Sequence, residues 1–77
     1  MPNYPVTEIH FSIPEPRHVV LTVYDIQGRR VRVLLNQLMN AGTHTVRFDG
    51  SDLPAGIYFY TIQAGHFTAT RRMLLLK

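Results

Sequence analysis

Cysteine and tryptophan are both absent from this 77-residue sequence, and long apolar runs are missing as well. Without cysteine, neither a disulfide framework nor a thiolate metal site is available, so packing and backbone hydrogen bonds must stabilise the fold. The longest uncharged apolar run is residues 73–76, whereas a membrane-spanning helix needs roughly 20 residues. The first residues also lack a basic segment followed by an apolar one, so we expect any export signal to lie upstream or to be absent.

The composition is that of one small globular domain. Hydrophobic residues make up 45% of the chain and charged residues 17%, which is too apolar for a disordered tail. The formal net charge is +3, and every basic residue except Lys77 is an arginine. The arginines cluster at residues 29–32 and 71–72 without the interleaved aromatic residues of a nucleic-acid platform. We therefore expect the arginines to lie on solvated faces or to act as gatekeepers, which keep edge strands from pairing with other chains, rather than to bind nucleic acid.

Apolar and polar residues alternate through most of the chain, which is the period-two pattern of half-buried β-strands. Turn signals separate the alternating segments. Asp25 and Gly28 predict a hairpin turn, whereas residues 36–42 are expected to form a crossing loop that is too short for an independent helix. Six or seven short strands with such spacing predict a small antiparallel β-sandwich. The expected strands are residues 7–13, 19–25, 30–35, 43–49, 57–63 and 67–76.

Residues 53–60 have the spacing of a tyrosine corner, in which a tyrosine near a strand start hydrogen-bonds to the upstream turn backbone. Tyr58 is the candidate for this role. Tyr60 and Ile62 would then face inward with it, while Ile57 and Phe59 would face outward. Such an exposed apolar pair indicates a neighbour, a partner or a covering loop, unless Phe59 is simply half-buried beneath an arginine stem.

The last predicted strand is basic and then continuously apolar, so its pattern does not tell which leucines face the core. One interpretation is a strand with an exposed apolar face that pairs with another sheet or is bound by a receptor. The other is a strand that pairs inside the sandwich and leaves two leucines on the surface. The residues concerned are Arg71, Arg72, Met73, Leu74, Leu75, Leu76 and Lys77.

No residue pattern predicts catalysis, a cofactor or a metal site. The three aspartates all lie in turns, where such side chains cap backbone N–H groups, and residues 49–52 offer too few oxygens for calcium. The histidines lie on separate segments, and His44 alone shares the face of Val46 and Phe48, as a hydrogen-bonded packing residue would. No hydroxyl has a histidine partner in a nucleophile elbow. We therefore predict a protein that is not an enzyme.

Four segments occur in a characteristic order: VYDIQGRRV, AGTHTVRFDG, LPAGIYFYTIQAG and RRMLLLK. Together they resemble the C-terminal sorting domain of type IX (Por) secretion cargo of Bacteroidetes and related bacteria, and the related Ig-like domain of flagellar hook-capping proteins. The resemblance implies an all-β, immunoglobulin-like antiparallel sandwich over residues 7–77, with residues 1–6 as a residual linker. The matching positions are Asp25, Gly28, Arg29, Gly42, His44, Asp49, Gly50, Gly56, Tyr58 and Lys77.

The resemblance also implies a function. Such a domain is a non-catalytic handle by which an N-terminal cargo domain is exported through the outer membrane to the cell surface or medium. Its implied partners are the outer-membrane translocon, which we expect to contact residues 71–77, and a surface sortase-like peptidase that can remove the domain and attach the cargo to lipopolysaccharide. The family commonly begins with an N-Y-P-N-P-F-N-P-x-T stretch, but here Asn3–Pro5 is followed directly by Val6 and Thr7.

Two alternative functions remain open from the sequence. The first is an accessory module of a polysaccharide-degrading enzyme that binds glycan through Tyr4, Tyr24 or Phe59. The second is a self-assembly domain like that of hook-capping proteins, which would show weak self-association. Export of a fused reporter would favour the sorting function over both.

Overall fold

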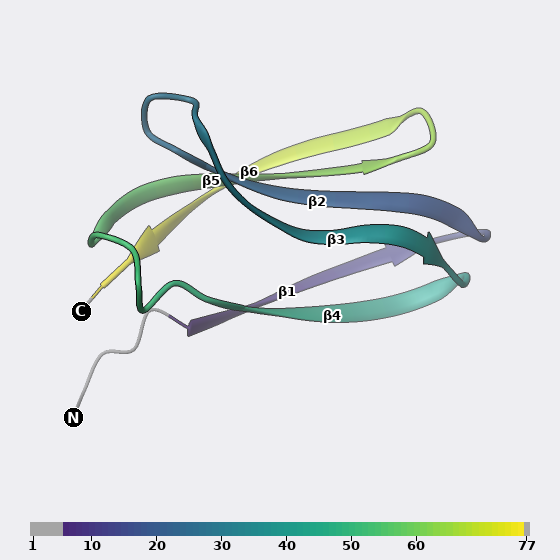
Figure 1. Cartoon of the computed structure of the whole chain (residues 1–77). Coiled ribbons are helices and arrows are strands. Elements are labelled where there is room, and N and C mark those ends of the chain that lie inside the picture. Colours follow the sequence, from purple (N-terminus) through teal and green to yellow (C-terminus); the bar gives the residue numbers. More distant parts are fainter. Residues whose placement is uncertain (1–5, 77) are drawn as a thin grey trace.

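The structure is a computed structural model that describes residues 6–76. It confirms an all-β fold with the six predicted strands arranged in two layers (Figure 1). The described part of the chain contains no helix, and therefore none that could cross a membrane. The strands are β1 (Val6–Ile13), β2 (Arg17–Asp25), β3 (Arg30–Met39), β4 (Gly42–Asp49), β5 (Gly56–Ala64) and β6 (Phe67–Leu75).

The strand order identifies the sandwich type. One sheet pairs β1 with β4, and the other has the order β3-β2-β5-β6, with every pair antiparallel. Only β2–β3 and β5–β6 are hairpins, because the other connections cross between the sheets. This order is that of immunoglobulin strands B and E facing strands C′, C, F and G. The Ig-like sandwich predicted from the sequence is therefore confirmed.

The inward-facing side chains of the central strand β2 form the middle of the core. Val19, Leu21 and Val23 are completely buried between the sheets, as the period-two pattern predicts. Phe48 of β4 is also completely buried and packs from the opposite layer. Full burial of side chains of this kind contributes about 1.5–3 kcal/mol each, so the thin core depends on a few residues. Other buried apolar residues are Ile9, Ile13, Tyr58, Ile62, Ala64 and Leu75.

The prediction of a crossing loop at residues 36–42 is wrong. Strand β3 continues to Met39, and its residues 36–39 pair with residues 17–20 of β2. Only Asn40 and Ala41 connect β3 to β4. The apolar residues Leu35, Leu38 and Met39 mimic helical spacing, but the long neighbouring strand β2 satisfies their backbone groups in a ladder.

The two edges of the four-stranded sheet are less covered than its centre. The edge strands β3 and β6 contribute only Leu75 to the buried apolar core, whereas β2 and β5 contribute most of it. On the outer face, Ile57 is exposed and Phe59 is half-buried beside its cross-strand partner Arg72. The outward orientation of both residues is therefore as predicted, and Phe59 is half-buried as in the alternative interpretation.

Candidate recognition surface

The turn between β2 and β3 is held together by the side chain of Asp25. Its Oδ1 accepts the backbone N–H groups of Gln27 and Arg29, both at 2.9 Å, and its Oδ2 accepts Arg29 Nε at 2.9 Å. Gly28 has a φ of 83°, a left-handed conformation that favours glycine. These bonds lower the pKa of Asp25, with the Arg29 backbone N–H as the main cause. The Asp25, Gly28 and Arg29 positions of the motif thus form a self-contained turn.

The tyrosine corner predicted at Tyr58 is confirmed. The Tyr58 hydroxyl donates a hydrogen bond of 2.7 Å to the backbone carbonyl oxygen of Pro54. Tyr58 is the third residue of β5, two positions after Gly56, and its side chain is buried in the core. The bond ties the loop after β4 to the four-stranded sheet, so these residues have a structural role in the sandwich.

The residues of the motif in and next to β4 also have local structural roles. His44 Nε2 donates to the backbone carbonyl oxygen of Asn40 at 2.7 Å, and its ring lies against Phe11 with centroids 5.4 Å apart. Asp49 Oδ1 accepts the backbone N–H of Ser51 at 2.9 Å, and this bond is the main reason that the pKa of Asp49 is lowered. His44 is therefore a packing histidine, as predicted, and Asp49 caps a turn. Gly42, the remaining turn position of this block, is the first residue of β4.

Gly50 lies at a tightly packed position. A Cβ at this position would lie 2.7 Å from Leu75 Cδ1 and 3.2 Å from the Phe48 ring. Separations this short cannot be accommodated unless the neighbours move. The end of β6 is thus packed directly onto the turn that follows β4.

Arg32 is a structural residue that sequence reasoning missed. Its side chain leaves β3 toward the loop after β4, where Nη1 donates to the carbonyl oxygen of Asp49 at 2.8 Å. Nη2 donates to the Asp52 carboxylate, and the guanidinium lies 5.5 Å from the centroid of the Phe48 ring. The expectation of a solvated arginine is wrong here, because a contact between residues 20 positions apart leaves no signal in local alternation.

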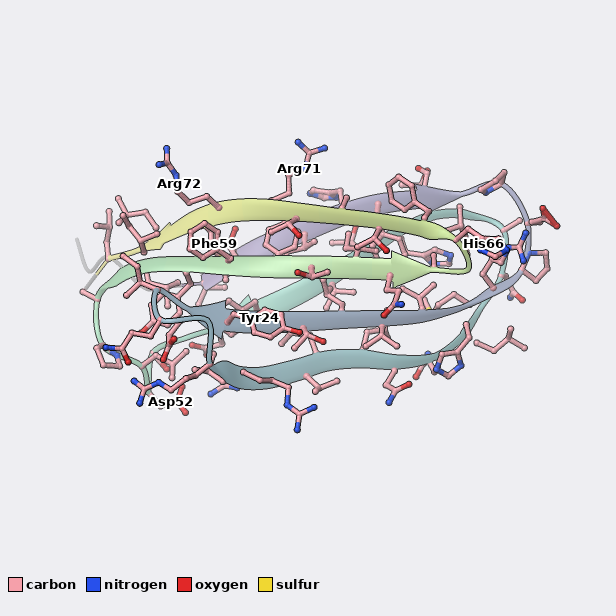
Figure 2. The ribbon with its side chains drawn as sticks, turned by 90° about the horizontal axis from the view of Figure 1, so that it is seen from above. Tyr24, Asp52, Phe59, His66, Arg71 and Arg72 are labelled. Atoms are coloured by element: carbon pink, nitrogen blue, oxygen red, sulfur yellow. The ribbon has the colours of Figure 1, made fainter. Side chains whose placement is uncertain are left out.

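Residues 71–77, which we call the 71–77 segment, include the last five residues of β6. The pairing with β5 resolves the ambiguous leucines: Leu75 is 2% exposed, whereas Leu74 is 61% and Leu76 52% exposed. Met73 is half-buried, and Arg71 and Arg72 are exposed and project past the outer edge of β6 (Figure 2). Lys77 lies outside the described residues. An open hollow of about 380 Å³ beside this segment is lined by Ile57, Arg72, Met73 and Leu74.

The histidines and carboxylates form no group of three or more that could hold a metal ion within residues 6–76. Instead they make pairwise contacts. His10 hydrogen-bonds to Thr45 at 3.0 Å, and His18 to Asn36 at 2.6 Å, in each case between neighbouring strands. Arrangements of this kind are typical of side chains on a solvated β-sheet.

Comparison with known proteins identifies the family. A family model described as a secretion system C-terminal sorting domain (Por secretion tail) matches residues 2–76. No curated protein and no solved structure matches the chain. The match spans the whole sandwich, including the Asp25 turn, the tyrosine corner and nearly all of the 71–77 segment. The chain therefore belongs to the family of type IX secretion system C-terminal sorting domains.

Proposed function

We propose that the outer-membrane translocon of the type IX system recognises this domain at the 71–77 segment. Sorting domains of this family direct the attached cargo through the type IX system to the cell surface or medium, and this chain is such a signal. The observation that carries the proposal is the exposed, basic and apolar edge of β6. Two arginines, Leu74 and Leu76 project here from the last strand of the sheet and the residue that follows it.

The orientation of β6 divides the 71–77 segment into two sets. Leu75 faces the core and packs onto Gly50, so it serves the fold. The exposed set is Arg71, Arg72, Leu74 and Leu76, which a receptor reaches without unfolding the domain. This division supports recognition of a folded module rather than of an unfolded tail.

The same proposal includes the remaining partners and boundaries. A sorting domain carries an N-terminal cargo and interacts with the secretion system. The sequence placed the boundary between residues 6 and 7, but Val6 is the first residue of β1 and pairs with Asp49, so we assign the sorting domain to residues 6–77 and the linker to residues 1–5. We assign removal of the domain to a surface sortase-like peptidase. Family members are non-catalytic in general, and we assign no catalytic step to this domain.

Export of a fused reporter in a type IX-competent host tests the site. Deletion of residues 71–77 would also remove the buried Leu75, so substitutions of the exposed set are the sharper experiment. The test variant replaces Arg71, Arg72, Leu74 and Leu76 with serine. A control with one charge and two apolar side chains replaces Arg30, Val33 and Leu38 with serine on the opposite edge strand β3, where all three side chains are exposed, and is compared with a β6 variant in which only Arg72, Leu74 and Leu76 are replaced.

We expect all of these variants to stay folded, because exposed substitutions change stability by about 0.5 kcal/mol or less each, although together they can lower the melting temperature by roughly 10 °C. The β6 variants should lose export and the β3 variant should keep it. A folded β6 variant that is exported like the parent would show that the translocon reads another surface.

The glycan-binding alternative has no support from the comparisons. Tyr24 and Phe59 are cross-strand partners on the outer face of the four-stranded sheet, and both are half-buried (Figure 2). Tyr4 lies outside the described residues. The self-assembly alternative also has no support from the comparisons, because they give no self-assembling relative.

A further inference from the structure

We propose that the free edge of β6 accepts an extended acidic segment of a partner as an added β-strand, with carboxylates paired to Arg71 and Arg72. This inference rests on the proposed function, since it names how the 71–77 segment is bound and by what chemistry. Strand addition combines main-chain hydrogen bonds, which give affinity, with side-chain contacts, which give specificity. Three properties of β6 lead to this conclusion.

The first property is the regularity of the edge. Strand β6 is the last strand of its sheet, and it pairs with β5 without interruption from Leu75 opposite Gly56 to Phe67 opposite Ala64. The opposite edge strand, β3, has two register shifts against β2. Bulges, prolines, short length and edge charges are the usual means by which proteins block strand addition at an edge. Of these, β6 has only the charges Arg71 and Arg72, which oppose a basic or neutral strand but not an acidic one. Its outer N–H and C=O groups therefore form a continuous template.

The second property is unpaired positive charge on both faces of the edge. Arg71 lies opposite Tyr60 on the inward face, and Arg72 lies opposite Phe59 on the outward face. Neither guanidinium makes an ion pair with any residue between 6 and 76. By contrast, three other arginines have carboxylate partners: Arg17 with Glu15, Arg29 with Asp25 and Arg32 with Asp52. An added strand with two consecutive acidic residues would place one carboxylate beside each guanidinium.

The third property excludes a second copy of β6 as the occupant. Two β6 strands paired antiparallel along their whole length bring Arg71 opposite Arg71 or Arg72 of the other copy. Like charges directly opposite each other destabilise a strand pair. The arginines thus act against self-pairing and in favour of an acidic partner. Leu74 is exposed on the same face as Arg72, so it favours a partner strand with an apolar residue two positions from one of the carboxylates.

Synthetic peptides test the proposal with the 77-residue chain itself. The probe is the acetylated peptide TVTEETVTV, and the charge control is TVTKKTVTV. A third peptide repeats the probe with alternate backbone nitrogens methylated, which removes main-chain donors and keeps the glutamates. Binding is measured by fluorescence anisotropy, and amide chemical shifts identify the strand that is contacted.

We expect the glutamate probe to bind and to shift amides of β6 rather than β3. The lysine peptide and the methylated peptide should each bind at least about tenfold more weakly, the scale set by two cross-strand ion pairs or several main-chain bonds. The double variant R71E/R72E should reverse the preference and bind the lysine peptide. The matched variant R30E/R47E has the same change in net charge on β3 and β4 and should keep the parent preference.

Several outcomes would overturn the proposal. Equal binding of the probe and its methylated form would mean that only the charges matter, as for a phosphate-bearing surface. Equal loss in both arginine variants would mean that net charge alone acts. Concentration-dependent dimers through β6 would mean that a second copy is the occupant. Because these measurements involve no export, strand addition can fail while the reporter test succeeds, and the reverse, so the two proposals are judged separately.

Discussion

Arg32 and Asp52 form a two-pronged contact between the edge of the four-stranded sheet and the loop that follows β4. Arg32 Nη2 lies 2.9 Å from Oδ1 and 2.7 Å from Oδ2 of the Asp52 carboxylate. Through Nη1 the same guanidinium donates to the carbonyl oxygen of Asp49. One side chain thus connects both layers of a sandwich that has no disulfide.

Substitution of Arg32 with alanine should lower the free energy of unfolding by about 1–2 kcal/mol, because a charged hydrogen bond to a carbonyl and packing on Phe48 are lost with the exposed ion pair. Arg32→Lys should recover less than half of the loss, since an ammonium group lacks the planar fork. Urea unfolding measures both. Arg30→Ala is the control on the same strand, and an equal loss in that variant would contradict the role assigned to Arg32.

The Tyr58→Phe variant removes only the hydroxyl that donates to Pro54. We expect it to destabilise the domain by about 1 kcal/mol, the usual net contribution of such a bond. Tyr60→Phe is the matched control, because the Tyr60 hydroxyl makes no hydrogen bond to the described residues and should be dispensable. Thermal unfolding of the two variants compares them, and identical melting temperatures would argue against the tyrosine corner as a stabilising contact.

Acid should destabilise the domain in a definite pH window. The pKa values of Asp25 and Asp49 lie below the ordinary value of 3.8, chiefly because their carboxylates accept backbone N–H groups of Arg29 and Ser51. A lowered pKa in the folded state means that the stabilisation is fully present above about pH 4 and is lost as the pH falls through the folded-state pKa. Denaturant unfolding at a series of acidic pH values should show this decline. In the D25N/D49N variant the free energy of unfolding should fall less steeply with decreasing pH. An unchanged slope would show that these two carboxylates do not cause the decline.

Gly50→Ala should destabilise the domain by about 1–3 kcal/mol through overpacking against Leu75 and Phe48. Shortening Leu75 to valine removes the atom that approaches most closely. The cost of Gly50→Ala should therefore be smaller in a Leu75→Val background, with a coupling of about 1 kcal/mol in a double-mutant cycle. Strict additivity of the two substitutions would show that Gly50 is required for another reason.

Local patterns predicted most of the sandwich. A strand with one buried face must alternate, so residues 19, 21 and 23 could be assigned to one face from their order alone. The Asp25 turn and the tyrosine corner were equally predictable, because their hydrogen bonds join residues at most four positions apart. Interactions of this range leave a recognisable spacing in the chain.

Features that depend on contacts between residues distant in the sequence were predicted wrongly or not at all. Residues 36–39 extend β3 only because β2 offers them a ladder, and no property of those residues alone distinguishes this from a loop. Arg32 became a link between layers only when folding brought the loop after β4 beside β3.

The sequence by itself determined the existence of the strands, the two local turn and corner motifs and the family, because each depends on residue types at short, fixed spacings. The tertiary structure alone decided which leucine of the final run is buried. Four consecutive apolar residues carry no alternation, so the orientation of Leu75 toward the core and of Leu74 toward solvent came from the register with β5 and the space left by Gly50.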